Sequence, residues 1–293
     1  PKFLKSTVVH VSTRFTSSIR SSNNSTARPF QSSNRLSGRT CMITGGTSGI
    51  GFAIAERFLH EGASSVILVG RSQQRLEAAV KDLQSPDNVR FLVGDIAEVG
   101  SWMRELEKEM TNVDILVNAA GISISNILPR SELEDISKIL RTNLDGSILT
   151  SRALMRAAIR GRIRNRHAID GEKKPLSKCI INVSSLLALK AGTGAVPYAA
   201  SKAGVLGLTR SLAAEASISL KDIVIRSNAI VPGYIETPMI SDFTPGEVSK
   251  LNDMIPLHRF GTPEEVADAA VFLAQNEYAN NCVLNLDGGL SAV

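Results

Sequence analysis

From Arg39 onward, short runs of apolar residues alternate with longer segments of helical character, which leaves few folds open to this chain. The runs TCMIT, SVILVG, VRFLVG, VDILVNAAG, CIINVSS and IRSNAIVPG show no clean polar alternation, as is typical of strands covered on both faces. A helical segment between successive strands predicts parallel pairing through right-handed crossovers. We therefore predict a single-domain α/β fold over residues 37–293, a doubly wound, Rossmann-type parallel sheet of about seven strands with helices on both faces.

Residues 1–36 lie outside this pattern. They are rich in Ser, Thr, Asn and Arg and contain no acidic residue, which is the composition of a mitochondrial or plastid transit peptide. The alternative is an untargeted tail that is too polar to bury a core. We expect a leader that is excluded from the fold and a location in the mitochondrial matrix, with a cytoplasmic location as the alternative.

A second polar segment, residues 160–178, interrupts the strand and helix rhythm and is expected to form a surface loop. It carries seven basic residues against two acidic ones. In an extended segment, arginines at every second position would share one side and could steer an acidic partner. A solvated loop without a partner is the alternative. The arginines concerned are Arg160, Arg162, Arg164 and Arg166.

The charge and the cysteines exclude several classes of protein. Seven of the 33 basic residues precede Glu56, the first acidic residue, so the remaining 26 face 28 acidic residues and do not indicate nucleic-acid binding. The three cysteines have no metal-ligand spacing, which predicts a reducing compartment and no metal site. No apolar run approaches the roughly 20 residues of a membrane span.

A glycine cluster follows the first expected strand and opens the first expected helix. Glycines there allow a tight turn and a close approach of the backbone to a pyrophosphate, and the helix N-terminus supplies free N–H groups. The spacing GxxxGxG differs from the GxGxxG fingerprint, and a purely structural turn is the alternative. The expected phosphate loop contains Gly45, Thr47, Ser48, Gly49, Ile50 and Gly51.

The end of the second expected strand bears on the choice of dinucleotide. An NAD enzyme usually carries a carboxylate there for the ribose 2′-hydroxyl, whereas this chain reads LVGRS at residues 68–72. Arg71 can pair with a 2′-phosphate through its planar guanidinium, or it is an ordinary solvated arginine. We expect NADP(H) as the cofactor, with NAD(H) as the alternative.

Tyr198 and Lys202 are four residues apart in PYAASKAG, which places them on one face of a helix. A positive charge about 5 Å away would lower the pKa of the phenol by roughly two units, into the range of general acid–base catalysis. Such pairs also occur on ordinary helices. The preceding strand ends in CIINVSS, and the ends of parallel strands are where α/β proteins bind ligands, so a serine hydroxyl is expected beside the tyrosine.

Taken in order, these motifs resemble the short-chain dehydrogenase/reductase family from about Ser37 to Val293. The matching segments are TGGTSGIG at 44–51, Asp95, NAAG at 118–121, LRTNLDG at 140–146, Ser185 with YAASK at 198–202, VPGYIETPM at 231–239 and LDGG at 286–289. The resemblance implies an oxidoreductase that transfers a hydride between a nicotinamide and a carbonyl carbon.

The resemblance also implies a role for each catalytic residue. Tyr198 would be the general acid in reduction, and Lys202 would lower the pKa of Tyr198 and bind the nicotinamide ribose. Ser185 would orient the carbonyl. Asn143 would hold a water that links Lys202 to solvent, or it simply bridges backbone groups. The expected catalytic set is Asn143, Ser185, Tyr198 and Lys202.

Further cofactor contacts follow from the same resemblance. Asp95 and Ile96 would contact the adenine, Asn118 would support the ribose side, and Thr237 would reach the carboxamide; for Asp95 the alternative is the end of a strand. Outside the glycine loop the expected set is Arg71, Asp95, Ile96, Asn118, Ala119, Gly121, Tyr198, Lys202, Pro232, Gly233, Ile235 and Thr237.

Within the family, the segments IVPGYIETPM, HRFGTPEEVADAAVFLA and LNLDGGLSA are most similar to 3-oxoacyl-[acyl-carrier-protein] reductases of the mitochondrial type. This implies NADPH-dependent reduction of a carrier-linked 3-oxoacyl thioester in fatty-acid synthesis, by a homotetramer. The alternatives are a reductase or dehydrogenase for another carbonyl or alcohol, such as a quinone, sugar or steroid, and a catalytically silent subunit.

Overall fold

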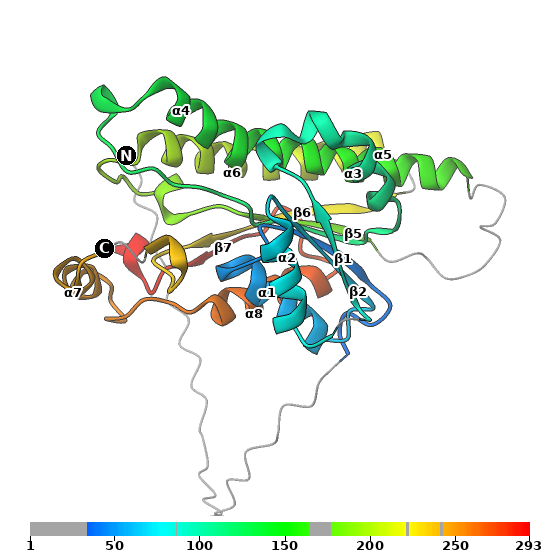
Figure 1. The fold of residues 1–293 in the computed structure, drawn as a ribbon, viewed down its shortest axis with the longest axis horizontal. Helices are drawn as coiled ribbons and strands as arrows, with labels where there is room; N and C mark the ends of the chain where they lie inside the picture. Colours follow the sequence, from blue (N-terminus) through cyan, green and yellow to red (C-terminus); the bar gives the residue numbers. More distant parts are fainter. Residues whose placement is uncertain (1–33, 86, 165–176, 221–222, 241–242) are drawn as a thin grey trace, which may run out of the picture. The chain divides into compact units, whose positions relative to one another are not determined.

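The computed structural model describes residues 34–293 except 86, 165–176, 221–222 and 241–242. Residues 1–33 of the expected leader, and most of the segment 160–178, therefore lie outside the described residues. Within the described part, a seven-stranded parallel sheet lies between two layers of helices (Figure 1). The predicted fold class is confirmed.

Every neighbouring pair of strands in the sheet is parallel, and the order is β3-β2-β1-β4-β5-β6-β7. The order reverses between β1 and β4, and in such sheets a ligand crevice lies beyond the carboxyl ends of the strands at the reversal. The strands are β1 Thr40–Thr44, β2 Ser65–Gly70, β3 Val89–Val93, β4 Ile115–Asn118, β5 Lys178–Val183, β6 Ile225–Pro232 and β7 Val283–Leu286.

Two hydrophobic cores, one on each face, hold the helices to the sheet. Successive side chains of a strand point to opposite faces, so Ile43 joins the core beneath α1, α2 and α8, while Met42 joins the core beneath α3, α5 and α6. The helices are α1 Gly49–His60, α2 Gln73–Asp82, α3 Met103–Glu109, α4 Leu133–Leu140, α5 Gly146–Arg164, α6 Val196–Ser219, α7 Pro245–Met254 and α8 Pro263–Gln275.

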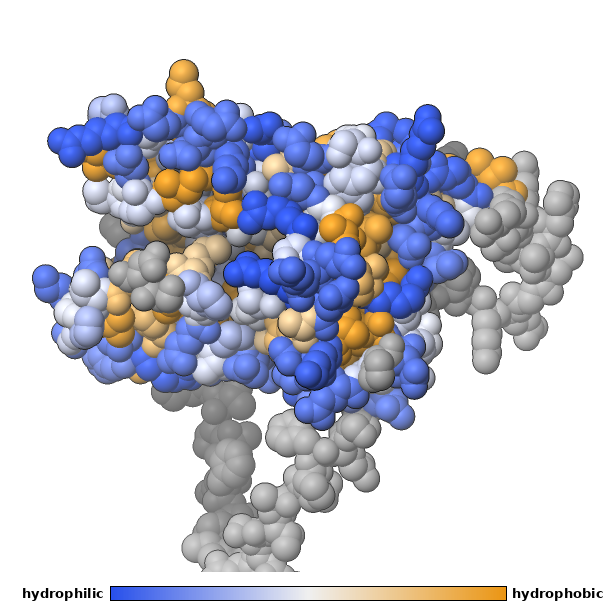
Figure 2. Space-filling view, viewed as in Figure 1, coloured by the Kyte–Doolittle hydropathy of each residue, from blue (hydrophilic) through white to orange (hydrophobic). Residues whose placement is uncertain are grey.

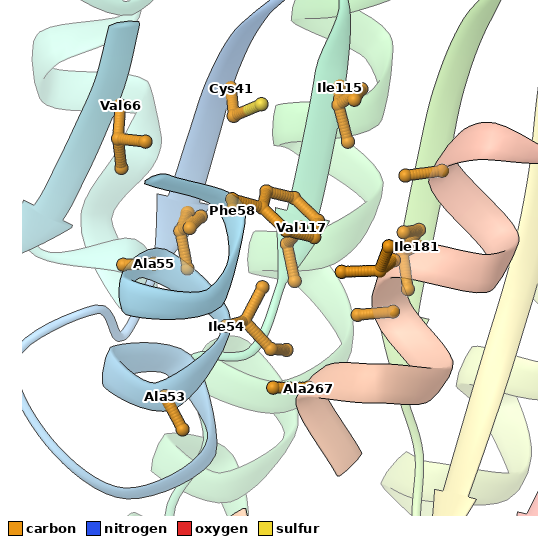
Figure 3. Packing of buried hydrophobic residues seen from close by; sticks show 14 of the residues in the cluster. Cys41, Ala53, Ile54, Ala55, Phe58, Val66, Ile115, Val117, Ile181 and Ala267 are labelled. Atoms are coloured by element: carbon orange, nitrogen blue, oxygen red, sulfur yellow. The ribbon is translucent and has the colours of Figure 1, made fainter. Parts of the chain in front are cut away.

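The core on the α1 side is shown from close by in Figure 3. Ile54 and Phe58 of α1 lie against Val117 of β4, and Ala267 of α8 lies close to Ile54. Both α1 side chains are fully buried, which stabilises the fold by about 2 kcal/mol each through removal of apolar surface from water. This packing fixes α1 directly behind the loop that joins it to β1.

The folded part begins earlier than the sequence indicates. Leu36, which falls within the expected leader, is 1% exposed and belongs to the core beneath α1. Its amide donates to the carbonyl of Glu61 at 2.9 Å, and Arg35 pairs with the Glu61 carboxylate at 3.5 Å. The boundary expected at residue 36 therefore needs to move toward the N-terminus.

The expectation of a loop from residue 160 is wrong for its first five residues, because α5 continues to Arg164. A helix turns about 100° per residue, so Arg160 and Arg162 do not form part of a one-sided row. The carboxylate of Glu107 in α3 forms ion pairs with Arg156 at 3.2 Å and with Arg160 at 2.9 Å. These pairs hold the last turns of α5 against α3. Arg166 lies outside the described residues.

The face of the molecule drawn in Figure 2 is mainly polar. Hydrophilic side chains dominate there and hydrophobic ones are scattered among them. No helix of the described residues is both long enough and apolar enough to cross a membrane.

Candidate active site

The glycine loop between β1 and α1 is shaped by close backbone contacts. Gly45 and Gly49 have φ values of +69° and +54°, which L side chains rarely adopt. A Cβ on Gly45 would lie 2.8 Å from the Cα of Ala120, and one on Gly51 would overlap the carbonyl of Gly45. The loop therefore needs glycine both for its own turn and for its packing against the end of β4.

The N-terminus of α1 fits an anionic group. Its N-cap, Ser48, makes no side-chain hydrogen bond to the helix, and the first turn carries no acidic residue. The free N–H groups and the positive end of the helix dipole are then directed at the loop, as in dinucleotide and phosphate sites. The residues present here therefore fit the pyrophosphate of a dinucleotide.

Thr44, the last residue of β1, was not among the expected site residues. Its hydroxyl accepts hydrogen bonds from the amides of Ala119 at 3.2 Å and Ala120 at 3.1 Å, and donates to the carbonyl of Val117 at 3.4 Å. It thereby fixes the segment after β4 beside the glycine loop. The signal in the sequence was a hydroxyl residue placed between an apolar strand and a glycine cluster.

Arg71 lies one residue beyond the end of β2 and is exposed. Among the described residues it forms no ion pair, and no carboxylate occupies the end of β2. Asp95, which follows β3, accepts a hydrogen bond from the amide of Ala97 at 2.9 Å and so begins the 3₁₀ turn Ile96–Trp102. Asp95 therefore acts as an N-cap and does not end the strand, since β3 ends at Val93. Arg71 remains available to a ligand.

The loop after β6 lies beside the glycine loop. A Cβ on Gly49 would lie 3.2 Å from Cγ2 of Thr237, so these two expected residues are neighbours. Gly233 is packed against the C-terminal loop, since a Cβ there would be 2.8 Å from Cα of Asp287. Ile235 forms a bridge with Gly261, which anchors the segment that leads to Thr237.

Ser185, Tyr198 and Lys202 meet at the carboxyl end of β5. Ser185 lies beside the phenol of Tyr198 and acts on its pKa. Lys202 is 4% exposed, and its Nζ donates to the carbonyl of Val183 at 2.8 Å and lies 5.7 Å from the centroid of the Tyr198 ring. Ser184 also contacts this helix, because its hydroxyl donates to the carbonyl of Lys202 at 2.8 Å.

Burial dominates the protonation of this pair. It lowers the pKa of Lys202 to about 8, because a charged ammonium loses its hydration in the interior. It also raises the pKa of the Tyr198 phenol, while the hydrogen bond from Ser185 acts in the opposite direction. The sequence pattern predicted a lowered tyrosine pKa, and the difference arises because both side chains are withdrawn from water together.

Asn143 lies in a π-helical turn, Arg141–Asp145, between α4 and α5. Its Oδ1 accepts from the amide of Ile122 at 2.9 Å, and its Nδ2 donates to the carbonyl of Ile122 at 3.0 Å and to Ser201 Oγ at 3.0 Å. A Cβ on Gly121 would be 3.3 Å from Lys202 Nζ and 3.4 Å from Asn143 Oδ1. Asn143 therefore lies across Gly121 from the lysine.

Asn118 is the centre of a buried amide and hydroxyl network below the site. It donates to Asn182 Oδ1 at 2.8 Å and accepts from Thr150 at 2.7 Å, and Asn182 donates to Thr209 at 3.0 Å. The network joins β4 and β5 to α5 and α6. The amide of Asn118 is occupied by protein partners. If Asn118 supports a ribose, it would therefore do so by fixing the backbone at the end of β4 and not by a side-chain contact.

The expected residues form two adjoining groups at the carboxyl edge of the sheet. One is the glycine loop with Thr237, which fits a dinucleotide phosphate; the other is Ser185, Tyr198 and Lys202 with Asn143 nearby. Across the described residues, no cluster of His, Cys, Asp and Glu has the arrangement of a metal site.

Comparison with known proteins agrees with this arrangement. The family model described as Enoyl-(Acyl carrier protein) reductase matches residues 45–291. The 3-oxoacyl-[acyl-carrier-protein] reductase of Bos taurus is 38% identical over 255 residues, which cover 86% of this chain and 98% of the relative. The structure of a gluconate 5-dehydrogenase from Burkholderia cenocepacia, in complex with NADP and tartrate, has a TM-score of 0.77 at 28% identity and covers 89% of this chain and 98% of its own.

A short chain dehydrogenase/reductase family protein of known structure has a TM-score of 0.73 at 32% identity and covers 88% of this chain and 100% of its own. The sequence relative, the family model and the fold all extend over most of the chain. The chain therefore belongs to the short-chain dehydrogenase/reductase family of NAD(P)-dependent oxidoreductases.

Proposed function

We propose that this chain reduces a 3-oxoacyl thioester, carried by an acyl carrier protein, to the 3-hydroxyacyl form with NADPH. The observation that carries the proposal is the Ser185 hydroxyl beside the phenol of Tyr198, with the buried Lys202 at 5.7 Å from the phenol ring. Two hydroxyls that converge on one point suit a carbonyl oxygen, which accepts two hydrogen bonds. The bovine relative named for this reaction supports the choice of substrate.

The residues of the site divide the work of the reduction. NADPH, when bound, supplies the hydride that adds to the carbonyl carbon. Tyr198 donates its hydroxyl proton to the carbonyl oxygen, and Ser185 donates a hydrogen bond to the same oxygen as negative charge develops on it. The ammonium of Lys202, 5.7 Å from the ring, stabilises the phenolate that remains, and a proton from solvent then restores the phenol.

The preference for NADPH over NADH rests on the end of β2. Arg71 is exposed and free of ion pairs within the described residues, and the carboxylate that would bind a ribose 2′-hydroxyl is absent from this strand end. A planar guanidinium binds a phosphate through two parallel hydrogen bonds. The gluconate 5-dehydrogenase of similar fold binds NADP.

The same dehydrogenase supports a second candidate, the oxidation or reduction of a sugar acid at this site. A panel of NADPH-dependent assays separates the candidates: acetoacetyl-carrier thioester, free acetoacetyl thioester, 5-ketogluconate, a quinone, a ketosteroid and a crotonyl-carrier thioester. We expect the highest kcat/KM with the acetoacetyl-carrier thioester. A higher value for 5-ketogluconate or for the crotonyl thioester would replace the proposed substrate, and no turnover with any of them would favour a silent subunit.

The location and assembly of the protein are part of the same proposal. The basic, acid-free composition of residues 1–36 supports import into the mitochondrial matrix. The second part of the proposal is assembly into a homotetramer, which could cover Ile148 and Ile163 of α5, 40% and 69% exposed in the single chain. Fusing residues 1–36 to a fluorescent reporter tests the first claim, and sedimentation velocity of the enzyme tests the second. A cytosolic reporter or a monomer would contradict them.

A further inference from the structure

Ser201 carries a buried hydroxyl that lies between Asn143 and the backbone of Tyr198, two members of the proposed catalytic set. It lies one helical turn after Tyr198 in α6 and is 0% exposed. Its Oγ donates to the carbonyl of Tyr198 at 2.7 Å and accepts from Nδ2 of Asn143 at 3.0 Å. Asn143 in turn is bound to both backbone groups of Ile122. A continuous set of hydrogen bonds thus runs from the loop after β4 to the backbone of the tyrosine.

The donors and acceptors in this set admit only one arrangement. The single hydroxyl proton of Ser201 goes to the Tyr198 carbonyl, so the oxygen is left to accept from Asn143. Reversing the amide of Asn143 would place oxygen against the Ile122 carbonyl and nitrogen against the Ile122 amide. The orientation of Asn143 is therefore fixed from both sides.

Water has little access to replace a lost partner, because Asn143 is only 1% exposed. A buried donor left without an acceptor costs about 1–3 kcal/mol. Asn143 also lies in a π-helical turn, an irregularity that is common at functional sites and that here directs its amide toward α6. The link between Asn143 and Ser201 is thus costly to break and is placed where α6 begins.

The first turns of α6 are then held at two points. Ser201 connects Tyr198 to Asn143 and the loop after β4, whereas Ser184 binds the carbonyl of Lys202 from the end of β5. Gly121, in the loop after β4, is close to both Asn143 and the lysine ammonium. A shift of this helix end would move the tyrosine hydroxyl and the ammonium together, and displacements of about 1 Å cost large factors in rate.

We propose that Ser201 is a positioning residue, which sets the placement of Tyr198 and Lys202 by joining Asn143 to the first turn of α6. It touches neither substrate nor cofactor in this role and acts through Asn143. The inference rests on the proposed function, because Tyr198 is the proton donor only in that proposal.

The test is the variant Ser201→Ala, with Ser217→Ala as the matched control. Ser217 makes the same bond to the carbonyl three residues earlier, at 2.7 Å to Ala214, but it is exposed at the far end of α6. Ser201→Ala should lower kcat about tenfold with the dissociation constant of NADPH unchanged, a loss that corresponds to about 1.4 kcal/mol. Ser217→Ala should change neither quantity.

Two further readouts separate positioning from a general loss of stability. The limb of the kcat profile that follows Lys202 should move to higher pH in Ser201→Ala, because a loosened helix end admits water to the ammonium. In a double-mutant cycle, adding Ser201→Ala to Asn143→Ala should change kcat less than twofold, because the link is already broken. Thermal unfolding and NADPH fluorescence show whether each variant is folded and loaded, and Ser201→Thr, which keeps the hydroxyl, should retain the wild-type pH profile.

The outcomes distinguish a failure of the positioning role of Ser201 from a failure of the proposed function. Wild-type kcat and pH profile in Ser201→Ala, or additive effects in the cycle, would overturn the positioning role while Tyr198→Phe remains inactive. Substantial activity in Tyr198→Phe would instead remove the proposed proton donor. If Ser201→Ala does not fold, a Ser201→Thr variant with a shifted pH profile would count against the proposal.

Discussion

Both edges of the sheet bury a cation, yet the two cations have opposite surroundings. At the carboxyl edge, Lys202 is 4% exposed and donates one hydrogen bond, to Val183. At the amino edge, Arg226 is 1% exposed and donates to the hydroxyl of Ser177 and to three backbone carbonyls. Its guanidinium also lies 3.7 Å from the carboxylate of Glu277. Equal burial therefore leaves one cation saturated with partners and the other nearly bare.

The difference teaches which buried charge is structural and which is reactive. A guanidinium stays protonated at any accessible pH, and its five donors can close off carbonyl groups at the end of a helix, as Arg226 does at α8. A lysine deprived of partners instead approaches the loss of its proton, and burial brings the pKa of Lys202 to about 8. The fully hydrogen-bonded Arg226 stabilises the fold at the amino edge. The ammonium of Lys202, with few partners, can take part in proton transfer at the carboxyl edge.

The strongest test of this comparison is Arg226→Met. We expect the free energy of unfolding to fall by about 3–5 kcal/mol, because three buried carbonyls and Ser177 lose their donor at once. Urea unfolding measures the loss, and kcat of the folded fraction should be unchanged. Arg259→Met is the control, since Arg259 is half exposed and solvent screens its pair with Glu265, so this variant should unfold close to the wild type. If Arg226→Met and Arg259→Met were equally stable, the buried guanidinium of Arg226 would not have the structural role assigned to it.

Tyr198→Phe tests the carboxyl edge, where we expect a large loss of activity with little change in stability. Removing only the hydroxyl should lower kcat at least 100-fold, about 2.7 kcal/mol in barrier, while NADPH binding and the unfolding midpoint change little. Steady-state kinetics and cofactor fluorescence measure the two effects. Tyr278→Phe, at a residue that is 98% exposed, should behave as wild type. More than a tenth of wild-type kcat in Tyr198→Phe would mean that another group donates the proton.

The pKa of Lys202 also predicts how stability depends on pH. Its folded-state pKa is about 8, below the ordinary 10.5, so between these values the unfolded chain binds more protons than the folded one. Stability therefore rises with pH in this window, by about 2 kcal/mol between about pH 8 and about pH 10. The phenol of Tyr198 has its pKa raised and acts in the opposite sense at higher pH, so the gain is measured against Lys202→Met. Parallel curves for the two proteins would show that the ammonium is not destabilised.

Much of the fold and of the site at the carboxyl edge could be predicted from the sequence, because local sequence patterns specify them. The alternation of apolar strands and helices predicted the parallel sheet, and the glycine cluster predicted the turn before α1. Tyr198 and Lys202 were placed on one face by their spacing alone, and a serine hydroxyl was placed near them by the rule that parallel strands end at one edge. The choice of Ser185 followed from the family resemblance.

The remainder depends on contacts between distant segments. Arg226 appears in the sequence as a polar residue that weakens a strand, and only the fold brings the last carbonyls of α8 to it. Leu36 follows a long polar stretch, so nothing local indicates that it packs in the core. The length of α5 was missed because Glu107, which binds Arg160, lies on another helix. The raised pKa of Tyr198 reflects depth of burial, which spacing does not encode.

Arg71 extends the comparison to a third cation, because it lies at the carboxyl edge like Lys202 but is exposed and, among the described residues, without an ion pair. Since the protein saturates the guanidinium of Arg226 at the amino edge, an arginine left open at the end of β2 should serve a ligand. Arg71→Asp should lower kcat/KM for NADPH about tenfold and raise it for NADH, because a charge-assisted phosphate contact is replaced by repulsion and by an acceptor for a ribose hydroxyl. Arg152→Asp, an exposed arginine of α5, carries the same charge change and should leave the ratio of the two cofactors unaltered. An unaltered ratio in Arg71→Asp would assign the 2′-phosphate to another group and reduce Arg71 to a solvated side chain.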